Sequence, residues 1–126
     1  MKYVCLCYSE ERTLDALSEH EFDVLMAETL DCVDTLQKSG QLVAAERLDH
    51  VHSATTVRVR NGKLSVSDGP FAETKEQLGG FFLISARDLN DAIRIASNLP
   101  PARLGTIEIR PIEDLSQRRF RGVDPL

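Results

Sequence analysis

The sequence predicts a single α+β domain, because strand-like and helix-like segments alternate as two strand–helix–strand units with a hairpin between them. The chain has 126 residues, a usual length for one domain with one hydrophobic core. Hydrophobic residues make up 42% and charged residues 28%. This composition is typical of a folded globular protein and excludes a disordered or coiled-coil chain.

Two strands are expected in the first unit. The continuous apolar segment Tyr3–Tyr8 is too short for a helix and predicts a central strand that is buried on both faces. A second strand is predicted over Leu42–Leu48. This strand starts apolar and becomes charged near its far end, at Glu46 and Arg47, so two charged groups are placed on opposite faces of the sheet.

A helix is predicted between these strands. Ser18 and Glu21 stand three residues apart and form a capping box at its start. Apolar residues then recur at spacings of three and four as far as Leu36, which is the pattern of a helix with one buried stripe. Gly40 follows in the position where a left-handed glycine usually ends a helix.

The segment Thr56–Ser67 predicts a β-hairpin. Asn61 and Gly62 suit a type I′ turn, in which both central residues need a positive φ. The two-residue loop fixes the register, so that Arg60 faces Lys63, Val59 faces Leu64 and Val57 faces Val66. In this register the four apolar residues share one face, which is expected to be the buried side of the hairpin.

The second unit repeats the order of the first. Gly79–Ile84 predicts a strand, Asp88 caps a short helix, and Pro100 with Pro101 ends it. Thr106–Ile112 alternates apolar and charged residues as a half-buried strand does. Without the hairpin the order is the ferredoxin-like βαββαβ, whose antiparallel sheet carries both helices on one face. A homodimer with the two sheets face to face would cover the other face.

Composition also limits location and partners. No apolar run approaches the roughly 18 residues of a membrane span, and the first residues turn acidic too early for a secretory signal, so we expect a cytoplasmic protein with no membrane partner. The net charge of −5 argues against direct nucleic-acid binding, although residues 117–121 form a small basic patch. Cys5, Cys7 and Cys32 lack metal-ligand spacing, and buried free thiols are expected.

A polar loop, residues 68–76, lies between the hairpin and the next strand. It reads DGPFAETKE, and Asp-Gly-Pro is turn chemistry because glycine permits unusual φ values and proline fixes its own. An exposed connection is the simple interpretation of its charged residues. A carboxylate in a partly buried cleft can instead serve as a general acid or base, which makes Asp68 a candidate.

The stretch DGPFAETKEQLGGFF resembles the signature of the DGPF subgroup of the YCII-related family. MKYVCLCY at the start, Leu42–Leu48 and the hairpin TTVRVRNGK are similar to that family as well. The resemblance implies one YCII-related domain over residues 1–126, with 114–126 as a C-terminal tail, folded as a ferredoxin-like protomer of a dimeric α/β barrel. The wider family carries a His–Asp pair in its cleft; His20 lies near the corresponding position, but the DGPF motif does not include it.

The chemistry of the polar residues and the family resemblance together indicate five candidate site residues. Asp68 and Glu46 are the candidate catalytic carboxylates. Three residues are candidates for substrate binding: Arg47, Glu73 and Lys75. Turn capping by Asp68, salt bridges of Glu46 and Arg47 to Glu108 or Arg110, and a solvated Lys75 are the structural alternatives. His50 and His52 follow Asp49 in a pattern too weak to predict a metal site.

Two functions therefore remain open. The first is an acid–base enzyme that acts on a small polar or aromatic molecule in a dimer cleft and needs no cofactor, since the chain has no glycine-rich phosphate loop. The second is a non-catalytic ligand-binding or regulatory module. The resemblance implies a link to sigma factors of the extracytoplasmic-function group, and the chain would reach them through protein contacts. A purely structural dimer ranks last.

Overall fold

An antiparallel sheet of four strands forms the centre of the molecule, in the order β2–β5–β1–β6. The computed structural model describes residues 1–117. The strands of this sheet are β1 (Lys2–Ser9), β2 (Leu42–Arg47), β5 (Gln77–Ser85) and β6 (Thr106–Pro111). The α-helices are α1 (Glu11–Asp15), α2 (Glu19–Lys38) and α3 (Leu89–Ser97), and short 3-10 turns η1 (Val51–Ser53), η2 (Pro100–Arg103) and η3 (Leu115–Gln117) connect or follow them. The α+β class and the antiparallel sheet agree with the prediction.

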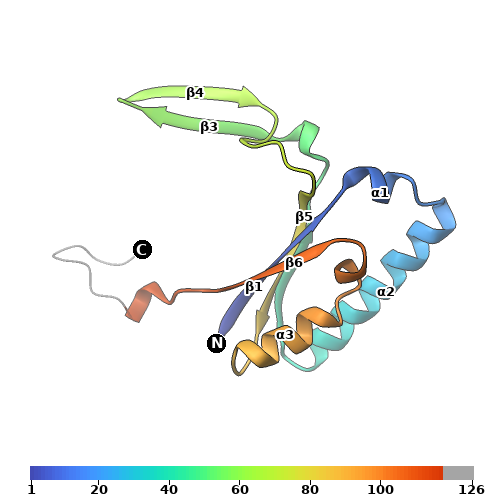
Figure 1. Ribbon diagram of the computed structural model, residues 1–126. Helices are drawn as coiled ribbons and strands as arrows, with labels where there is room; N and C mark the ends of the chain where they lie inside the picture. The colour runs from blue at the N-terminus through green and yellow to red at the C-terminus, as the bar shows by residue number, and fades with distance from the viewer. Residues whose placement is uncertain (118–126) are drawn as a thin grey trace.

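The two long helices lie on the same face of the sheet (Figure 1). Because side chains alternate along a strand, Tyr3, Cys5 and Cys7 of β1 point to this face and are buried. They form one core with Phe82 and Ile84 of β5 and with apolar residues of both helices. Burial of this alternating set is what fixes the register of the sheet.

The opposite face of the sheet carries no helix. Val4 and Leu6 of β1 and Phe81 and Leu83 of β5 point to it, and all four are only partly buried. Burial of β1 is therefore one-sided within the chain, because every second residue of the apolar segment remains accessible. This surface is called the open face below.

The predicted helix ends are confirmed. Ser18 Oγ accepts the backbone N–H of Glu21, and the Glu21 carboxylate accepts the N–H of Ser18, as a capping box requires. Gly40 has φ +75° after the last turn of α2. Asp88 caps α3 by accepting the N–H of Asp91. The short helix α1 lies in the stretch after Tyr8 for which no helix was predicted.

A buried carboxylate fixes the start of α3. Asp91 is 5% exposed and accepts the backbone N–H of Arg87 (3.0 Å) and the Nη2 of Arg94 (2.8 Å). These bonds hold the pKa of Asp91 well below its usual range. The charge is thus stabilised locally, and the group is structural because its donors all come from the same turn and helix.

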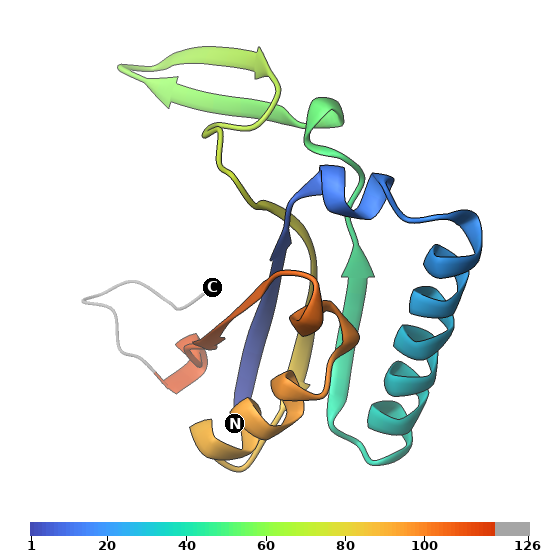
Figure 2. The same ribbon diagram turned by 45° about the vertical axis from the view of Figure 1, so that its right-hand side comes forward.

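The hairpin has the predicted register but not the predicted burial. β3 (Thr55–Arg60) and β4 (Lys63–Asp68) pair as a separate two-stranded sheet, with Val59 opposite Leu64 and a positive φ at Asn61 and Gly62. Its apolar residues remain 58–67% exposed. The expectation of a buried side is wrong for a single chain, because the hairpin projects away from the sheet on the side opposite α2 (Figures 1 and 2).

Two features predicted near the C-terminus reach beyond the described residues. The predicted tail, 114–126, is described only to residue 117, and the arginines of the basic patch at 118, 119 and 121 fall outside the described residues. Within residues 1–117, no helix has the length and hydropathy needed to cross a membrane.

Candidate functional site

A cavity of about 440 Å³ lies between α2 and the sheet. Its wall on the helix side consists of Leu25, Met26, Thr29, Leu30 and Val33. Its floor comes from the ends of β1, β2 and β5, and η2 closes one side. The volume falls within the range of ligand pockets, which are mostly apolar with a few polar groups at defined points.

The cavity exists because small residues form its floor. Ala45, Gly79 and Gly80 line the floor and contribute little side-chain volume there. Gly80 has a further reason to be glycine, since a Cβ there would stand 2.7 Å from the carbonyl oxygen of Glu46. The close approach of β5 to β2 therefore excludes a side chain, and the cavity is part of how the strands pack.

Arg47 places a positive charge at the cavity. It pairs with Gly80 across the sheet and points to the side of α2, where its Cζ lies 5.0 Å from the centre of the Phe22 ring. Within residues 1–117, no carboxylate pairs with Arg47. A cation–π contact orients the guanidinium without neutralising it, so the group is free to bind an anion.

The thiol in the cavity wall is not a nucleophile at neutral pH. Burial, together with the nearby Cys5, raises the pKa of Cys7 to about 12. Only the thiolate reacts or binds metal efficiently. Cys5 and Cys7 are free and buried, as predicted, and Cys32 is free and half-buried.

Arg47 and Glu46 are the predicted site residues that line the cavity. The two alternate along β2, so the Glu46 side chain points to the open face when Arg47 points to α2. Asp68 lies at the base of the hairpin opposite Thr55 and is exposed. Within the described chain its carboxylate accepts no hydrogen bond, so the structure gives no support to its alternative role in capping the turn.

The other two predicted residues lie in the loop that follows. Glu73 is exposed, and Lys75 Nζ lies 3.8 Å from the carboxylate of Glu10. Neither residue is part of the cavity wall. The structure thus separates the five candidates into two at the cavity and three on the hairpin and its loop.

Hydrogen bonds join the second half of the polar loop to neighbouring elements of the main sheet and to α1. Gln77 Nε2 donates to the carbonyl of Thr74 (2.7 Å), and Gln77 Oε1 accepts the backbone N–H of Glu11 (3.0 Å). Glu76 accepts the hydroxyl of Thr106 at the start of β6 (2.8 Å). These bonds give Thr74, Glu76 and Gln77 structural roles, because they join the end of the loop to α1 and β6.

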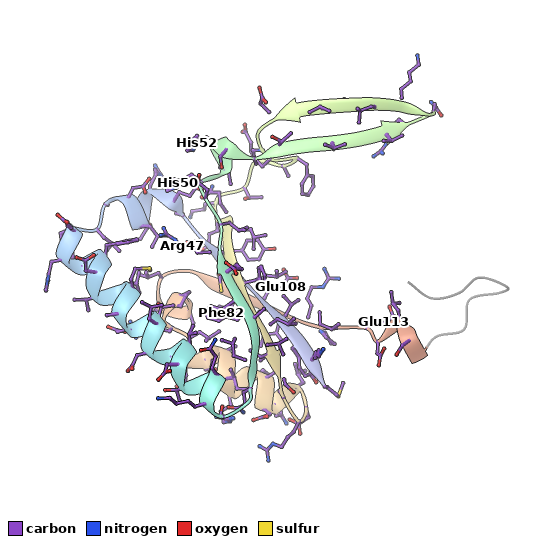
Figure 3. All side chains as sticks on the ribbon, turned by 180° about the vertical axis from the view of Figure 1, so that it is seen from behind. Arg47, His50, His52, Phe82, Glu108 and Glu113 are labelled. Atoms are coloured by element: carbon purple, nitrogen blue, oxygen red, sulfur yellow. The ribbon has the colours of Figure 1, made fainter. Side chains whose placement is uncertain are left out.

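A histidine–carboxylate pair that the sequence did not predict lies near the cavity. His50 Nε2 is 2.9 Å from Asp15 Oδ1. Asp15 follows the wall residue Leu14, and His50 comes three residues after Arg47; Figure 3 shows His50 next to Arg47, at the junction with the hairpin. The residues are 35 positions apart, and α1 was not predicted, so no spacing pattern could have indicated the pair.

His50 should make stability depend on pH. The hydrogen bond and charge of Asp15 raise the pKa of His50 above its ordinary value of 6.5. A raised pKa means that the stabilisation is complete below the unfolded value and is lost as the pH rises through the folded value. We expect the Tm difference between the wild type and His50→Gln to be largest below about pH 6.5 and to shrink above it. His52→Gln is the control, and an equal profile for both variants would contradict the assignment.

Acidic, histidine and cysteine side chains do not gather into a metal site in residues 1–117.

Tyr8 is a further titratable group at the sheet. Burial and the neighbouring Glu108 raise the pKa of Tyr8, so its phenol stays protonated at neutral pH. Glu108 lies on β6, on the open face (Figure 3).

The chain is similar to known proteins over most of its length. A model of the YCII-related domain matches residues 1–116. An uncharacterised protein of Rhizobium meliloti (strain 1021) is 38% identical over 114 residues, which cover 89% of this chain and 92% of the relative. The match includes the cavity, the hairpin and the polar loop, since all of them lie within residues 1–116.

Proposed function

Since the chain belongs to the YCII-related family, which the match over residues 1–116 shows, we propose that it binds a small, mostly apolar molecule with an anionic group. The ligand occupies the cavity between α2 and the sheet. The observation that carries the proposal is the 440 Å³ apolar cavity with Arg47 at its wall and no carboxylate paired with that arginine in residues 1–117. An aromatic carboxylate fits both features.

Arg47 is expected to supply the charge recognition. A charge-assisted hydrogen bond contributes about 1.5–3 kcal/mol, so Arg47→Gln should weaken binding of 1-naphthoate by about 10- to 100-fold. Binding of the neutral 1-naphthamide should change little. Isothermal titration calorimetry measures both affinities.

Arg110→Gln is the matched control, because it removes the same charge from the other face of the sheet. It should leave the affinity for 1-naphthoate unchanged. Equal losses in the two variants would mean that general electrostatic attraction, and not a site at Arg47, holds the anion.

At a second site, on the open face of the sheet, we propose acid–base catalysis on a small molecule without an organic cofactor. Glu46 and Asp68 are the proposed catalytic carboxylates of this second site, with Glu73 and Lys75 as its binding residues, while Arg47 is the proposed binding residue of the cavity on the other face. Glu46 points to the open face and Asp68 lies on the hairpin, which projects to the same side. These carboxylates would meet in a cleft formed with a second copy, as in a dimeric α/β barrel of ferredoxin-like protomers with an added hairpin.

Asp68→Ala tests the catalytic proposal. We expect activity, or ligand binding at the cleft, to be lost while the Tm stays within about 2 °C of the wild type, because the carboxylate makes no hydrogen bond within residues 1–117. Asp49→Ala is the control, since Asp49 is also exposed but accepts the N–H of His50. A large fall in Tm with unchanged activity would assign Asp68 a structural role instead.

A regulatory module is the second candidate. The exposed apolar residues of the hairpin favour it, because such patches mark protein interaction sites. In this proposal the ligand-bound chain acts in the cytoplasm on a sigma factor of the extracytoplasmic-function group, through protein contacts. The three free cysteines are in keeping with a reducing compartment. Co-purification of a sigma factor that ligand releases or recruits would separate this candidate from the enzyme.

A further inference from the structure

The short helix α1 lies at one end of the cavity and is held there by polar contacts. It contributes Leu14 to the cavity wall, and it lies at the end of the sheet from which the hairpin leaves (Figures 1 and 2). Its five residues are all half-buried or exposed. A helix of this length has little stability of its own in water, so its position depends on bonds to other elements.

Hydrogen bonds join α1 to the segment after β2 and to the polar loop. Glu11 Oε2 accepts the backbone N–H of Val51 (2.9 Å), and Asp15 Oδ1 lies 2.9 Å from His50 Nε2. The backbone N–H of Glu11 donates to Gln77 Oε1 (3.0 Å). Because α1 has no buried residue, these bonds can break without exposing the core.

We infer that α1 is a lid over the cavity, and that the contact between His50 and Asp15 is a latch that holds the lid closed while His50 carries a proton. The inference rests on the proposed function, since it describes how access to that ligand site is controlled. When the latch weakens, α1 moves away from the sheet and Leu14 leaves the cavity wall. A ligand can then enter at this end of the cavity.

The groups around His50 favour its protonated form. Asp15 and Glu11 act on it from α1, and Asp49 Oδ1 lies 3.8 Å from its Nδ1. The ring of His52 is 6.0 Å away, between centroids. The hydrogen bond and charge of Asp15 raise the pKa of His50, so the stabilisation of the closed lid is complete below the ordinary value and is lost as the pH rises through the raised one. Opening of the lid should therefore increase with pH.

The thiol of Cys7 reports access to the cavity without a ligand. Cys7 lines the cavity, and its pKa of about 12 keeps it unreactive while the cavity is closed to water. Dithiodipyridine, a small aromatic disulfide, forms a mixed disulfide with an accessible thiol and releases thiopyridone. Mass spectrometry gives the rate at each cysteine. Cys5 is buried in the core outside the cavity wall, so it is the internal control for unfolding.

His50→Gln should raise the rate at Cys7 about 2- to 5-fold over the wild type near pH 6, which is the range for an exposed ion pair, and the ratio should approach 1 near pH 8. Comparison at one pH cancels the pH dependence of the thiol itself. Near pH 6, Asp15→Asn should have the same effect and the double variant should add nothing, because each change removes one shared contact. His52→Gln is the control and should match the wild type. Equal Cys7 rates in His50→Gln and the wild type near pH 6, or a parallel rise at Cys5, would overturn the inference.

Hydrogen exchange of the wild type is the second measurement, and it does not depend on any variant folding. The amides of Glu11, Ala16 and Val51 donate the bonds that form α1 or hold it in place. Their protection factors, which are corrected for the intrinsic pH dependence of exchange, should fall between about pH 6 and pH 8, while those of α3 stay constant. Constant protection of the three amides would contradict the lid. Binding of 1-naphthoate is measured separately; its failure would reject the proposed ligand, while loss of protection in α1 would still support the lid.

Discussion

Thr29→Phe is expected to abolish binding of 1-naphthoate while leaving the protein folded. Thr29 lines the cavity from α2, in the turn that follows Leu25 and Met26. A phenylalanine there would occupy the space that the ligand needs. The affinity should fall at least about 100-fold, and the free energy of unfolding should stay equal or rise by about 1 kcal/mol, because the ring fills an apolar cavity. Calorimetric titration and thermal unfolding measure these opposite effects.

Thr35→Phe is the matched control for this variant. Thr35 also lies on α2, and its hydroxyl bonds the carbonyl four residues earlier, as that of Thr29 does. It is exposed and outside the cavity wall. Binding should therefore be retained. If Thr29→Phe binds 1-naphthoate as tightly as Thr35→Phe does, the ligand does not occupy the cavity.

Gly80→Ala should destabilise the protein by about 1–3 kcal/mol, which is the usual cost of overpacking. The new Cβ would lie 2.7 Å from the Glu46 carbonyl oxygen and 3.3 Å from the Cα of Arg47. Both are backbone atoms, so the end of β2 must move to make room. Arg47 would move with it, and the affinity for 1-naphthoate should fall as well. Chemical denaturation gives the stability change.

The neighbouring glycine is a control with almost the same sequence context. A Cβ at Gly79 would lie 3.9 Å from the Cys7 carbonyl oxygen, an ordinary contact. Gly79→Ala should therefore change stability by less than about 1 kcal/mol, since the alanine also restricts the unfolded chain. Equal losses in the two variants would show that general strand propensity, and not the contact with β2, explains both glycines.

Local signals predicted most of the fold. The capping box at Ser18, the turn at Asn61 and the cap at Asp88 each depend on a few neighbouring residues, and the structure confirms all three. Cross-strand pairs of the hairpin followed from its two-residue loop. These features can be predicted from the sequence because their physical causes act within a few positions along the chain.

The site was less predictable because its parts are distant in sequence. Alternation along β2 indicated that the Glu46 and Arg47 side chains face opposite ways, but only the packing of α2 shows which of them points toward the helix. The pair of His50 with Asp15 joins two segments that carry no shared pattern. The prediction that one face of the hairpin is buried was wrong. An alternating pattern shows that one face is apolar, but it does not show what covers that face.

An NMR titration with 1-naphthoate shows whether the space beneath α2 is a ligand site. We expect saturable shifts of the backbone amides of Met26, Thr29, Ala45 and Arg47, with smaller changes on the open face. Shifts confined to hairpin residues 55–68, or none at millimolar ligand, would contradict it.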